Sequence, residues 1–290
     1  LKPKLLCGAR RGPLSQERPP QRPMPSQDAA PAAAAADGAA EPQAGSLEGS
    51  KSAAQALRGI EQAVQTLLRS TSDLEACVAA LTTLEAATLR NAACHRRVFS
   101  SGGAKALTLA MATHLKDTRV QALACRTLQH LSASGRVESA TQLAQNGGCA
   151  AARFAMDTHP DDGLVQQVAC HALELMVFGS DEARSQAVTD GAVEAALKAL
   201  KNHRKNVYLA QAGLASLQSM IEDGPDCHQR IKKEGGVATI VGALAEHRDS
   251  AQTQYWGKLL LQGLCVASPD LRTEVLRKCH FQGLEVELPS

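Results

Sequence analysis

The feature that most constrains the fold of this chain is a glycine that recurs at an almost constant interval. Gly102, Gly147, Gly191 and Gly235 are separated by 45, 44 and 44 residues. Each follows an apolar-patterned stretch and a polar residue, and each precedes a second helical pattern. A glycine at such a point is typical of a helix end, because the residue after the last turn commonly takes a positive φ. Self-similarity at this period indicates a solenoid of stacked repeats.

Other positions recur in register with these glycines. About three helical turns after each glycine comes a histidine, and the four are His114, His159, His203 and His247. A later stretch carries an apolar anchor, a small residue and two further apolar residues at offsets of 4, 4 and 3, which places them on one helical face. The small residues would let neighbouring helices cross closely, and they are Ala124, Ala169, Gly213 and Gly257. Each unit is therefore predicted to contain a short helix, a glycine turn, a medium helix, a loop and a long helix.

The pattern continues less cleanly at both ends. Residues 53–68 and 74–89 are predicted to be the last two helices of a partial first unit, and residues 271–278 the first helix of an unfinished one. The predicted fold class is all-α, a right-handed solenoid of about five three-helix repeats with truncated terminal units. Such atypical ends are needed because an exposed stacking face is apolar.

The N-terminal segment lacks this periodicity. Residues 1–51 are predicted to form a disordered Pro/Ala-rich leader, because they cannot bury enough surface to offset the entropy of ordering, and residues 52–290 form the repeat domain. The start of the leader is basic, with only Glu17 against Lys2, Lys4, Arg10, Arg11, Arg18 and Arg22. An organelle transit peptide is therefore the alternative to a plain leader.

Composition narrows the functional classes. With 31 Lys+Arg against 29 Asp+Glu, the chain lacks the excess of positive charge that favours nucleic-acid binding, and no apolar run is long enough to span a membrane. Nine scattered cysteines without a CxxC pair indicate buried thiols in a reducing compartment, which predicts a cytoplasmic location. Phosphate-loop and catalytic motifs are missing, so we expect neither an enzyme nor a cofactor. The expected partner is another protein, and the chain itself is expected to be monomeric.

The third unit carries a resemblance to a known family. It contains His159-Pro160, Val165-Gln166 and the run Ala-Cys-His-Ala-Leu over residues 169–173, and the second unit keeps Val120-Gln121 and Ala-Cys-Arg-Thr-Leu over 124–128. Over residues 52–280 the chain resembles the armadillo family, whose units hold three helices in roughly 42–45 residues. It is similar to divergent armadillo repeat-containing proteins and the armadillo segment of leucine-rich-repeat kinases, rather than to the importin or catenin branch. The resemblance implies a non-enzymatic scaffold that binds a protein partner in the concave groove of the third helices. The alternative is a regulatory or targeting segment of a larger enzyme such as a kinase.

The resemblance also implies which residues would line that groove. Nuclear-import adaptors grip an extended peptide with a ladder of Trp and a ladder of Asn on the third helices. Here the Trp slots hold Arg126, His171, Ala215 and Leu259, and the Asn slots hold His130, Leu175, Ser219 and Gly263. Because neither ladder is present, gripping of a nuclear-localisation peptide is not expected. The predicted partner-binding residues are instead Arg119, Arg126, His130, Gln167, His171, Tyr208, Gln211 and Tyr255. Tyr and Arg are residue types enriched at binding hot spots.

The recurrent histidines suggest a metal site at first sight. Consecutive units stack roughly 8–10 Å apart, whereas zinc needs each ligand nitrogen about 2.1 Å away, so equivalent histidines cannot share an ion. We expect instead that each ring meets the C-terminal carbonyls of the medium helix that it follows. The four Cys-His dipeptides predict buried thiols rather than ligands, because adjacent helical residues point about 100° apart. No metal is therefore expected.

Overall fold

The computed structural model describes residues 47–69, 72–89, 92–133, 137–178 and 180–285. Nearly all of the leader predicted for residues 1–51 lies outside these ranges. The described residues form fifteen α-helices and one 3₁₀ turn and contain no strand, which confirms the all-α prediction. The first helix, α1 (Leu47–Arg69), starts a few residues before the predicted domain boundary at residue 52. No helix of the described ranges is both long and apolar enough to cross a bilayer.

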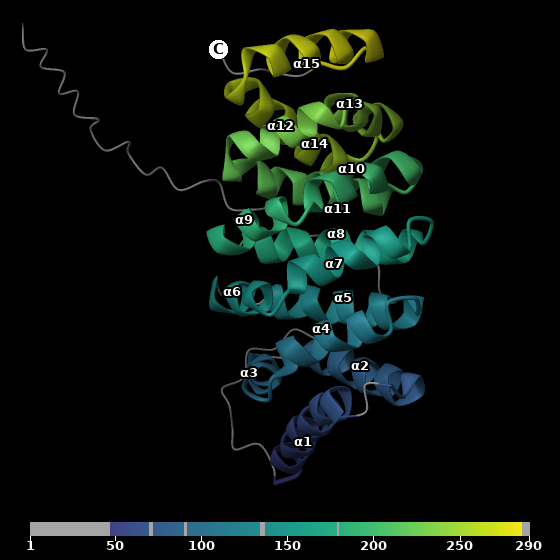
Figure 1. Ribbon diagram of the computed structural model, residues 1–290, viewed down its shortest axis with the longest axis vertical. Coiled ribbons are helices and arrows are strands. Elements are labelled where there is room, and N and C mark those ends of the chain that lie inside the picture. The colour runs from purple at the N-terminus through teal and green to yellow at the C-terminus, as the bar shows by residue number, and fades with distance from the viewer. Residues whose placement is uncertain (1–46, 70–71, 90–91, 134–136, 179, 286–290) are drawn as a thin grey trace, which may run out of the picture. The chain divides into compact units, whose positions relative to one another are not determined.

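The helices form four complete three-helix units with the predicted order of lengths (Figure 1). The short first helices are α3 (Ala92–Ser100), α6 (Val137–Gln145), α9 (Asp181–Thr189) and α12 (Pro225–Lys233). The second helices are α4 (Gly103–Thr113), α7 (Gly148–Thr158), α10 (Ala192–Asn202) and α13 (Gly236–Glu246). The long third helices are α5 (Thr118–Ser132), α8 (Gly163–Phe178), α11 (Val207–Met220) and α14 (Ala251–Ala267), and η1 (Ile221–Asp223) follows α11.

Truncated units lie at both ends of this stack, as predicted. The first unit consists of α1 and α2 (Leu74–Thr88), and α2 packs on α5 as a third helix does. The last helix, α15 (Pro269–Gln282), packs on α13 and α14 and buries Leu271, Val275 and Cys279. The spacing of these three residues puts them on one face of α15, and this face covers apolar surface of α13 and α14.

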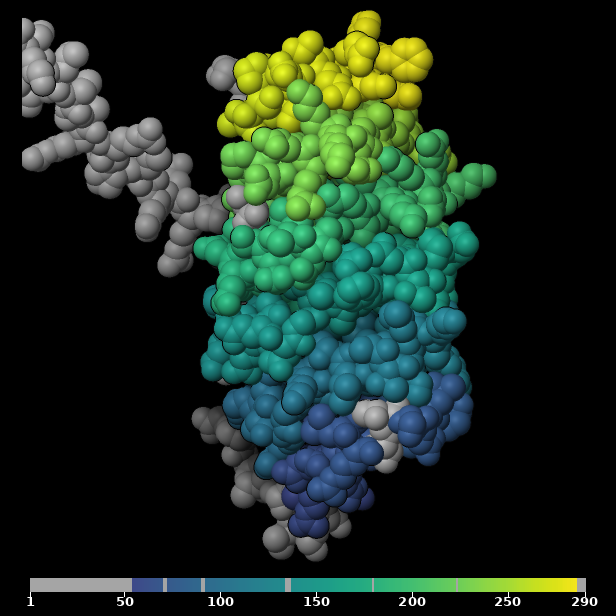
Figure 2. All heavy atoms as spheres, in the orientation of Figure 1, coloured from purple at the N-terminus to yellow at the C-terminus, as the bar shows by residue number. Residues whose placement is uncertain are grey.

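The helices of the described residues contact helices of their own repeat unit or of the next one. Every pair of helices with extensive contact belongs to one unit or to two consecutive units, and Figure 2 shows the units as successive bands of colour. Consecutive third helices contact one another extensively, so that α2, α5, α8, α11 and α14 form a continuous layer. We call the solvent-facing side of this layer the third-helix face.

The recurrent glycines have the backbone conformation that the sequence predicts. Gly102, Gly147, Gly191 and Gly235 have φ values of 83°, 80°, 91° and 64°. Each therefore reverses the chain between the first and second helix of its unit at little steric cost, since only glycine adopts this region readily. The small residues of the third helices also act as predicted. A Cβ atom added to Gly213 would lie 3.0 Å from the side chain of Leu200, because α10 and α11 approach closely there.

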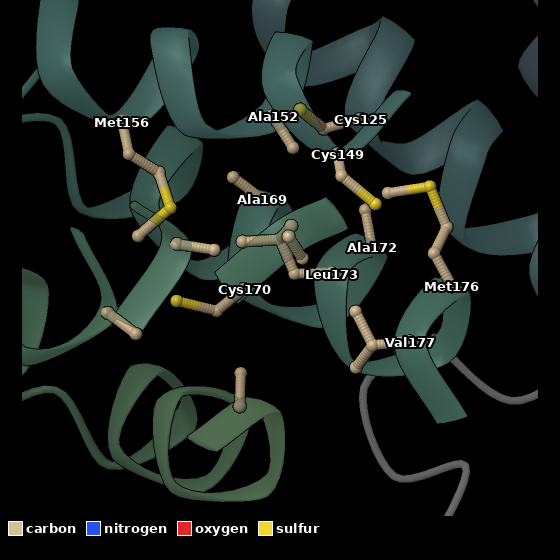
Figure 3. Close-up of a cluster of buried hydrophobic side chains, with 14 of the residues drawn as sticks. Cys125, Cys149, Ala152, Met156, Ala169, Cys170, Ala172, Leu173, Met176 and Val177 are labelled. Carbon is tan, nitrogen blue, oxygen red and sulfur yellow. The ribbon is translucent and has the colours of Figure 1, made fainter. Parts of the chain in front are cut away.

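The core combines leucine and valine with many small and sulfur-containing side chains. Figure 3 shows Cys125, Cys149 and Cys170 among alanines and methionines in the middle of the stack. Each of these thiols is free and at most 1% exposed. Burial in this apolar environment raises the pKa of each to about 12, so all three are neutral thiols that pack as small apolar side chains. The prediction of buried, structural cysteines is confirmed for the described part of the chain.

Three of the recurrent histidines, His159, His203 and His247, have a structural role, but their rings have a different partner from the one predicted. The Nε2 atom of His159 lies 2.7 Å from the carbonyl oxygen of Leu115, and Nε2 of His203 lies 2.8 Å from that of Pro160. The same contact joins His247 to Arg204 at 2.7 Å. Each of these three rings therefore donates to the helix-connecting loop of the preceding unit and links consecutive units. Each histidine does meet a C-terminal carbonyl of its own helix through its backbone N–H, but for these three rings the predicted partner was wrong.

A buried glutamine makes a second recurrent link. The Nε2 atom of Gln166 donates to the carbonyl oxygens of Met156 at 2.6 Å and His159 at 2.9 Å, at the C-terminal end of α7. Gln121 and Gln254 make the same pair of bonds in their units. These bonds satisfy carbonyls that a helix end leaves unpaired and fix the second helix against the third.

Candidate functional site

The predicted partner-binding residues all lie on third helices. Arg119, Arg126 and His130 belong to α5, Gln167 and His171 to α8, Tyr208 and Gln211 to α11, and Tyr255 to α14. All of them are half-buried or exposed. Because α5, α8, α11 and α14 are consecutive members of one layer, the structure brings these residues onto the same side of the stack. Their contacts divide them into two groups.

The arginines at the N-terminal end of the third-helix face are engaged in ion pairs with the layer itself. Arg119 lies 3.0 Å from a carboxylate oxygen of Glu75 on α2 and 3.0 Å from one of Asp117, the N-cap of α5. Hydrogen bonding from the Arg119 guanidinium is the main cause that lowers the pKa of Asp117. Arg126 reaches Glu85 on α2 at 3.3 Å. A charged partner at this end would have to compete with these pairs.

His130 belongs to a small polar cluster between α2, α3 and α5. Thr88 is buried, and its hydroxyl donates to the carbonyl oxygen of Glu85 at 2.9 Å. The Thr88 oxygen therefore accepts from Nδ1 of His130, 3.2 Å away, while His95 Nε2 donates to the Thr88 carbonyl at 2.6 Å. Desolvation is the main cause that lowers the pKa of His130, so the ring is neutral at physiological pH. These bonds join the first two units.

The other end of the face has almost no charge. Helix α11 contains no Asp, Glu, Lys or Arg, α8 contains only Glu174, and α14 contains only Lys258. Glu174 is buried, with an oxygen 3.6 Å from Nδ1 of His171. Tyr208 is 53% exposed and Tyr255 is 43% exposed, the latter packed edge-on against Trp256 with ring centroids 4.9 Å apart. Both Tyr therefore present their rings to solvent over an uncharged layer.

Leu164 is a member of this surface that sequence reasoning missed. It is 46% exposed and lies on the first turn of α8, in the same register position as Tyr208 on α11. A Cβ atom added to the neighbouring Gly163 would lie 3.5 Å from the side chains of Asn206 and His203, so the start of α8 lies close to the start of α11. The signal that could have found Leu164 is an apolar residue at an exposed position of the repeat. We call Leu164, Gln167, Tyr208, Gln211 and Tyr255 the uncharged patch.

A hollow in the described surface lies on the second helices. It has a volume of about 430 Å³ and is lined mainly by α7, α10 and α12. Its arginines are paired internally, Arg153 with Asp157 at 2.6 Å and Arg230 with Glu194 at 2.8 Å. Its lining contains neither histidine nor cysteine. Within the described ranges, no group of three or more His, Cys, Asp or Glu is arranged to hold a metal ion.

The layered three-helix units define an α-solenoid of the armadillo type, and comparison with solved structures agrees. An engineered protein is 24% identical, with a TM-score of 0.65 over 76% of this chain and 86% of that chain. A designed armadillo repeat protein, solved in complex with the peptide (KR)4, is 14% identical, with a TM-score of 0.64 over 77% of this chain and 88% of its own. A computationally designed armadillo repeat protein for modular peptide recognition is 16% identical, with a TM-score of 0.64. No family model and no curated protein matches the sequence. At these identities the likeness concerns the fold alone.

Proposed function

We propose that this protein is a non-enzymatic scaffold that binds another protein through its third-helix face. The observation that carries the proposal is the pair of solvent-exposed tyrosines, Tyr208 and Tyr255, on adjacent helices of one rigid layer. Tyrosine supplies large contact area at a low cost in conformational entropy and is enriched at binding hot spots. A partner that covers the two rings would remove their exposed apolar surface from water, which favours binding.

The architecture supports the same function. Solenoids whose units contact only their neighbours present extended surfaces, and binding is the use to which such surfaces are put. One structural neighbour is described as bound to a peptide and another as designed for peptide recognition. The fold is therefore compatible with an extended partner segment, although the residues that recognise it must come from this chain's own face.

The predicted anchors differ in what binding would require of them. Tyr208 and Tyr255 need no rearrangement, whereas Arg126 would have to leave or share Glu85. Because both members of that pair are partly exposed, their interaction contributes little to stability, and Arg126 remains available to a partner that brings a carboxylate. His171 lies between the two ends of the face, on α8.

The proposal is tested by a combined variant of the face. The full chain carrying Arg126→Glu, Tyr208→Ser and Tyr255→Ser should lose capture of its cellular partners, identified by mass spectrometry against the unmodified chain. The matched control is Phe154→Ser with Lys198→Glu, which alters an exposed aromatic and a cation on the second helices instead. Partners that are lost only from the third-helix variant support the proposal. Capture that is unchanged in this variant but lost in the control would show that the protein binds through the other layer.

A further inference from the structure

The third-helix face is uneven in charge, and this unevenness identifies the kind of ligand that its C-terminal end fits. Helices α2 and α5 carry Glu75, Glu85, Arg119 and Arg126, all joined in ion pairs within the layer. Helices α8, α11 and α14 contain 16, 14 and 17 residues, and across them only the buried Glu174 and the half-buried Lys258 are Asp, Glu, Lys or Arg. The uncharged patch lies on these three helices.

We infer that the uncharged patch binds an extended peptide segment that is itself uncharged and rich in apolar side chains. This inference rests on the proposed function, because it concerns the same face. Charge complementarity is the first argument. A lysine, arginine or carboxylate of a partner laid over α11 would find no counter-ion on that helix, since the charges nearest to Tyr208 in sequence, Arg204 and Lys205, lie in the loop before it; losing water without such a partner is unfavourable. Apolar and aromatic side chains lose nothing there and gain contact with Leu164, Tyr208 and Tyr255.

The two glutamines of the patch supply the second argument. Gln167 on α8 and Gln211 on α11 occupy the same register position on helices that pack directly together. A glutamine amide offers both a donor and an acceptor, as does each residue of a peptide main chain. Gln211 uses Nε2 to bond the Ser250 hydroxyl at 3.1 Å, which leaves its Oε1 for a peptide N–H. The amide of Gln167 makes no hydrogen bond within the described ranges, so both of its groups can pair with a ligand.

The spacing of the helices suits an extended main chain. Packed helices lie roughly 8–10 Å apart, and an extended chain advances about 3.3 Å per residue. A peptide that crosses α8, α11 and α14 would therefore meet equivalent positions about every three residues. Its main chain would bond the amides, and its apolar side chains would lie against Leu164, Tyr208 and Tyr255. The proposed ligand thus needs neither the Trp nor the Asn ladder that the chain lacks.

The test is selection of peptides from a phage-displayed library of random twelve-residue sequences on the full 290-residue chain. The selected peptides are then made with a fluorescent label and titrated by anisotropy. We expect sequences depleted in Lys, Arg, Asp and Glu and enriched in aromatic and aliphatic residues. We expect Tyr208→Ser or Tyr255→Ser to weaken their binding about tenfold or more, and Gln167→Ala with Gln211→Ala to weaken it about fivefold or more.

Matched variants decide among the outcomes. Phe154→Ser on α7 and Gln229→Ala on α12 change an exposed aromatic and an exposed glutamine elsewhere and should leave binding within twofold. Circular dichroism of each variant confirms that it is folded. Selection of charged peptides whose binding depends on Arg119 or Arg126 would overturn the inference and leave the proposed function standing. Selected peptides whose binding no third-helix substitution weakens, or a library that yields no binding sequence, would count against both.

Discussion

The buried glutamine link gives the sharpest prediction about stability. Gln166 is 2% exposed, and its amide donates to the carbonyl oxygens of Met156 and His159 at 2.6 and 2.9 Å. In the Gln166→Ala variant both bonds are lost at a site that excludes water. A net contribution of about 0.5–1.5 kcal/mol for each bond gives an expected loss of about 1–3 kcal/mol in the free energy of unfolding.

The neighbouring residue is a matched control. Gln167 is the same residue type on the same helix, but it is half-buried on the third-helix face and does not bond the carbonyls at the end of α7. Gln167→Ala should change the free energy of unfolding by less than about 0.5 kcal/mol. Urea unfolding followed by circular dichroism at 222 nm measures both variants under the same conditions. Equal destabilisation by the two substitutions, or no loss from Gln166→Ala, would refute the claim that these amide bonds hold α7 against α8.

Three further predictions follow from single features of the fold. Gly191→Ala should lower the free energy of unfolding by about 1–2 kcal/mol, because the φ of Gly191 is 91°. Gly242→Ala should raise it by about 0.5–1 kcal/mol, because Gly242 lies within a helix and faces open space. Equal changes for the two variants in urea unfolding would contradict this prediction. His203→Ala should lower the free energy of unfolding by about 1 kcal/mol, because it removes the bond to the carbonyl of Pro160. Amide hydrogen exchange of this variant should be faster in the loop after α7. Unchanged exchange in that loop would mean that the bond does not join the units. Burial raises the pKa of Cys170 to about 12, above that of the unfolded thiol. The contribution of this thiol to stability is therefore complete below about pH 9 and declines as the pH rises toward 12. Alkylation at pH 8 that labels Cys170 as fast in the native chain as in urea would be incompatible with this burial.

Much of the fold could be predicted from the sequence because each structural signal occurs again in every repeat. The positive φ of Gly147 follows from the need to turn the chain between two helices, and the closeness of α10 and α11 follows from the small residue at Gly213. Both depend on interactions that are local in the chain or repeated four times. The pattern therefore indicated the order and approximate bounds of the helices.

The contacts between units could not be predicted from the repeat pattern. The partner of His159 is the carbonyl of Leu115, which lies in another unit, and only the exact stacking of units decides between it and the carbonyls of α7. The ion pair of Arg119 with Glu75 is of the same kind, since each residue alone is an exposed charge at the same register position. Arg119 and Arg126 lie on a third helix, α5, but their pairing within the layer could not be predicted from the sequence.

The candidate site shows the same division. Tyr208 and Tyr255 could be predicted to be exposed because both lie outside the register positions that carry the apolar anchors of each unit. Leu164 escaped notice because a leucine in a repeat is expected to be buried. What makes the surface distinctive is a property of several helices together, the near absence of charge across α8, α11 and α14.

The central claim is that a partner segment lies across the third-helix face, and hydrogen–deuterium exchange tests it most directly. The full chain is compared with and without a saturating amount of a peptide selected from the random library. The account predicts slower exchange in peptic fragments that contain the N-terminal turns of α8, α11 and α14, with no change in α7, α10 and α13. Slower exchange confined to α7, α10 or α13 would contradict it.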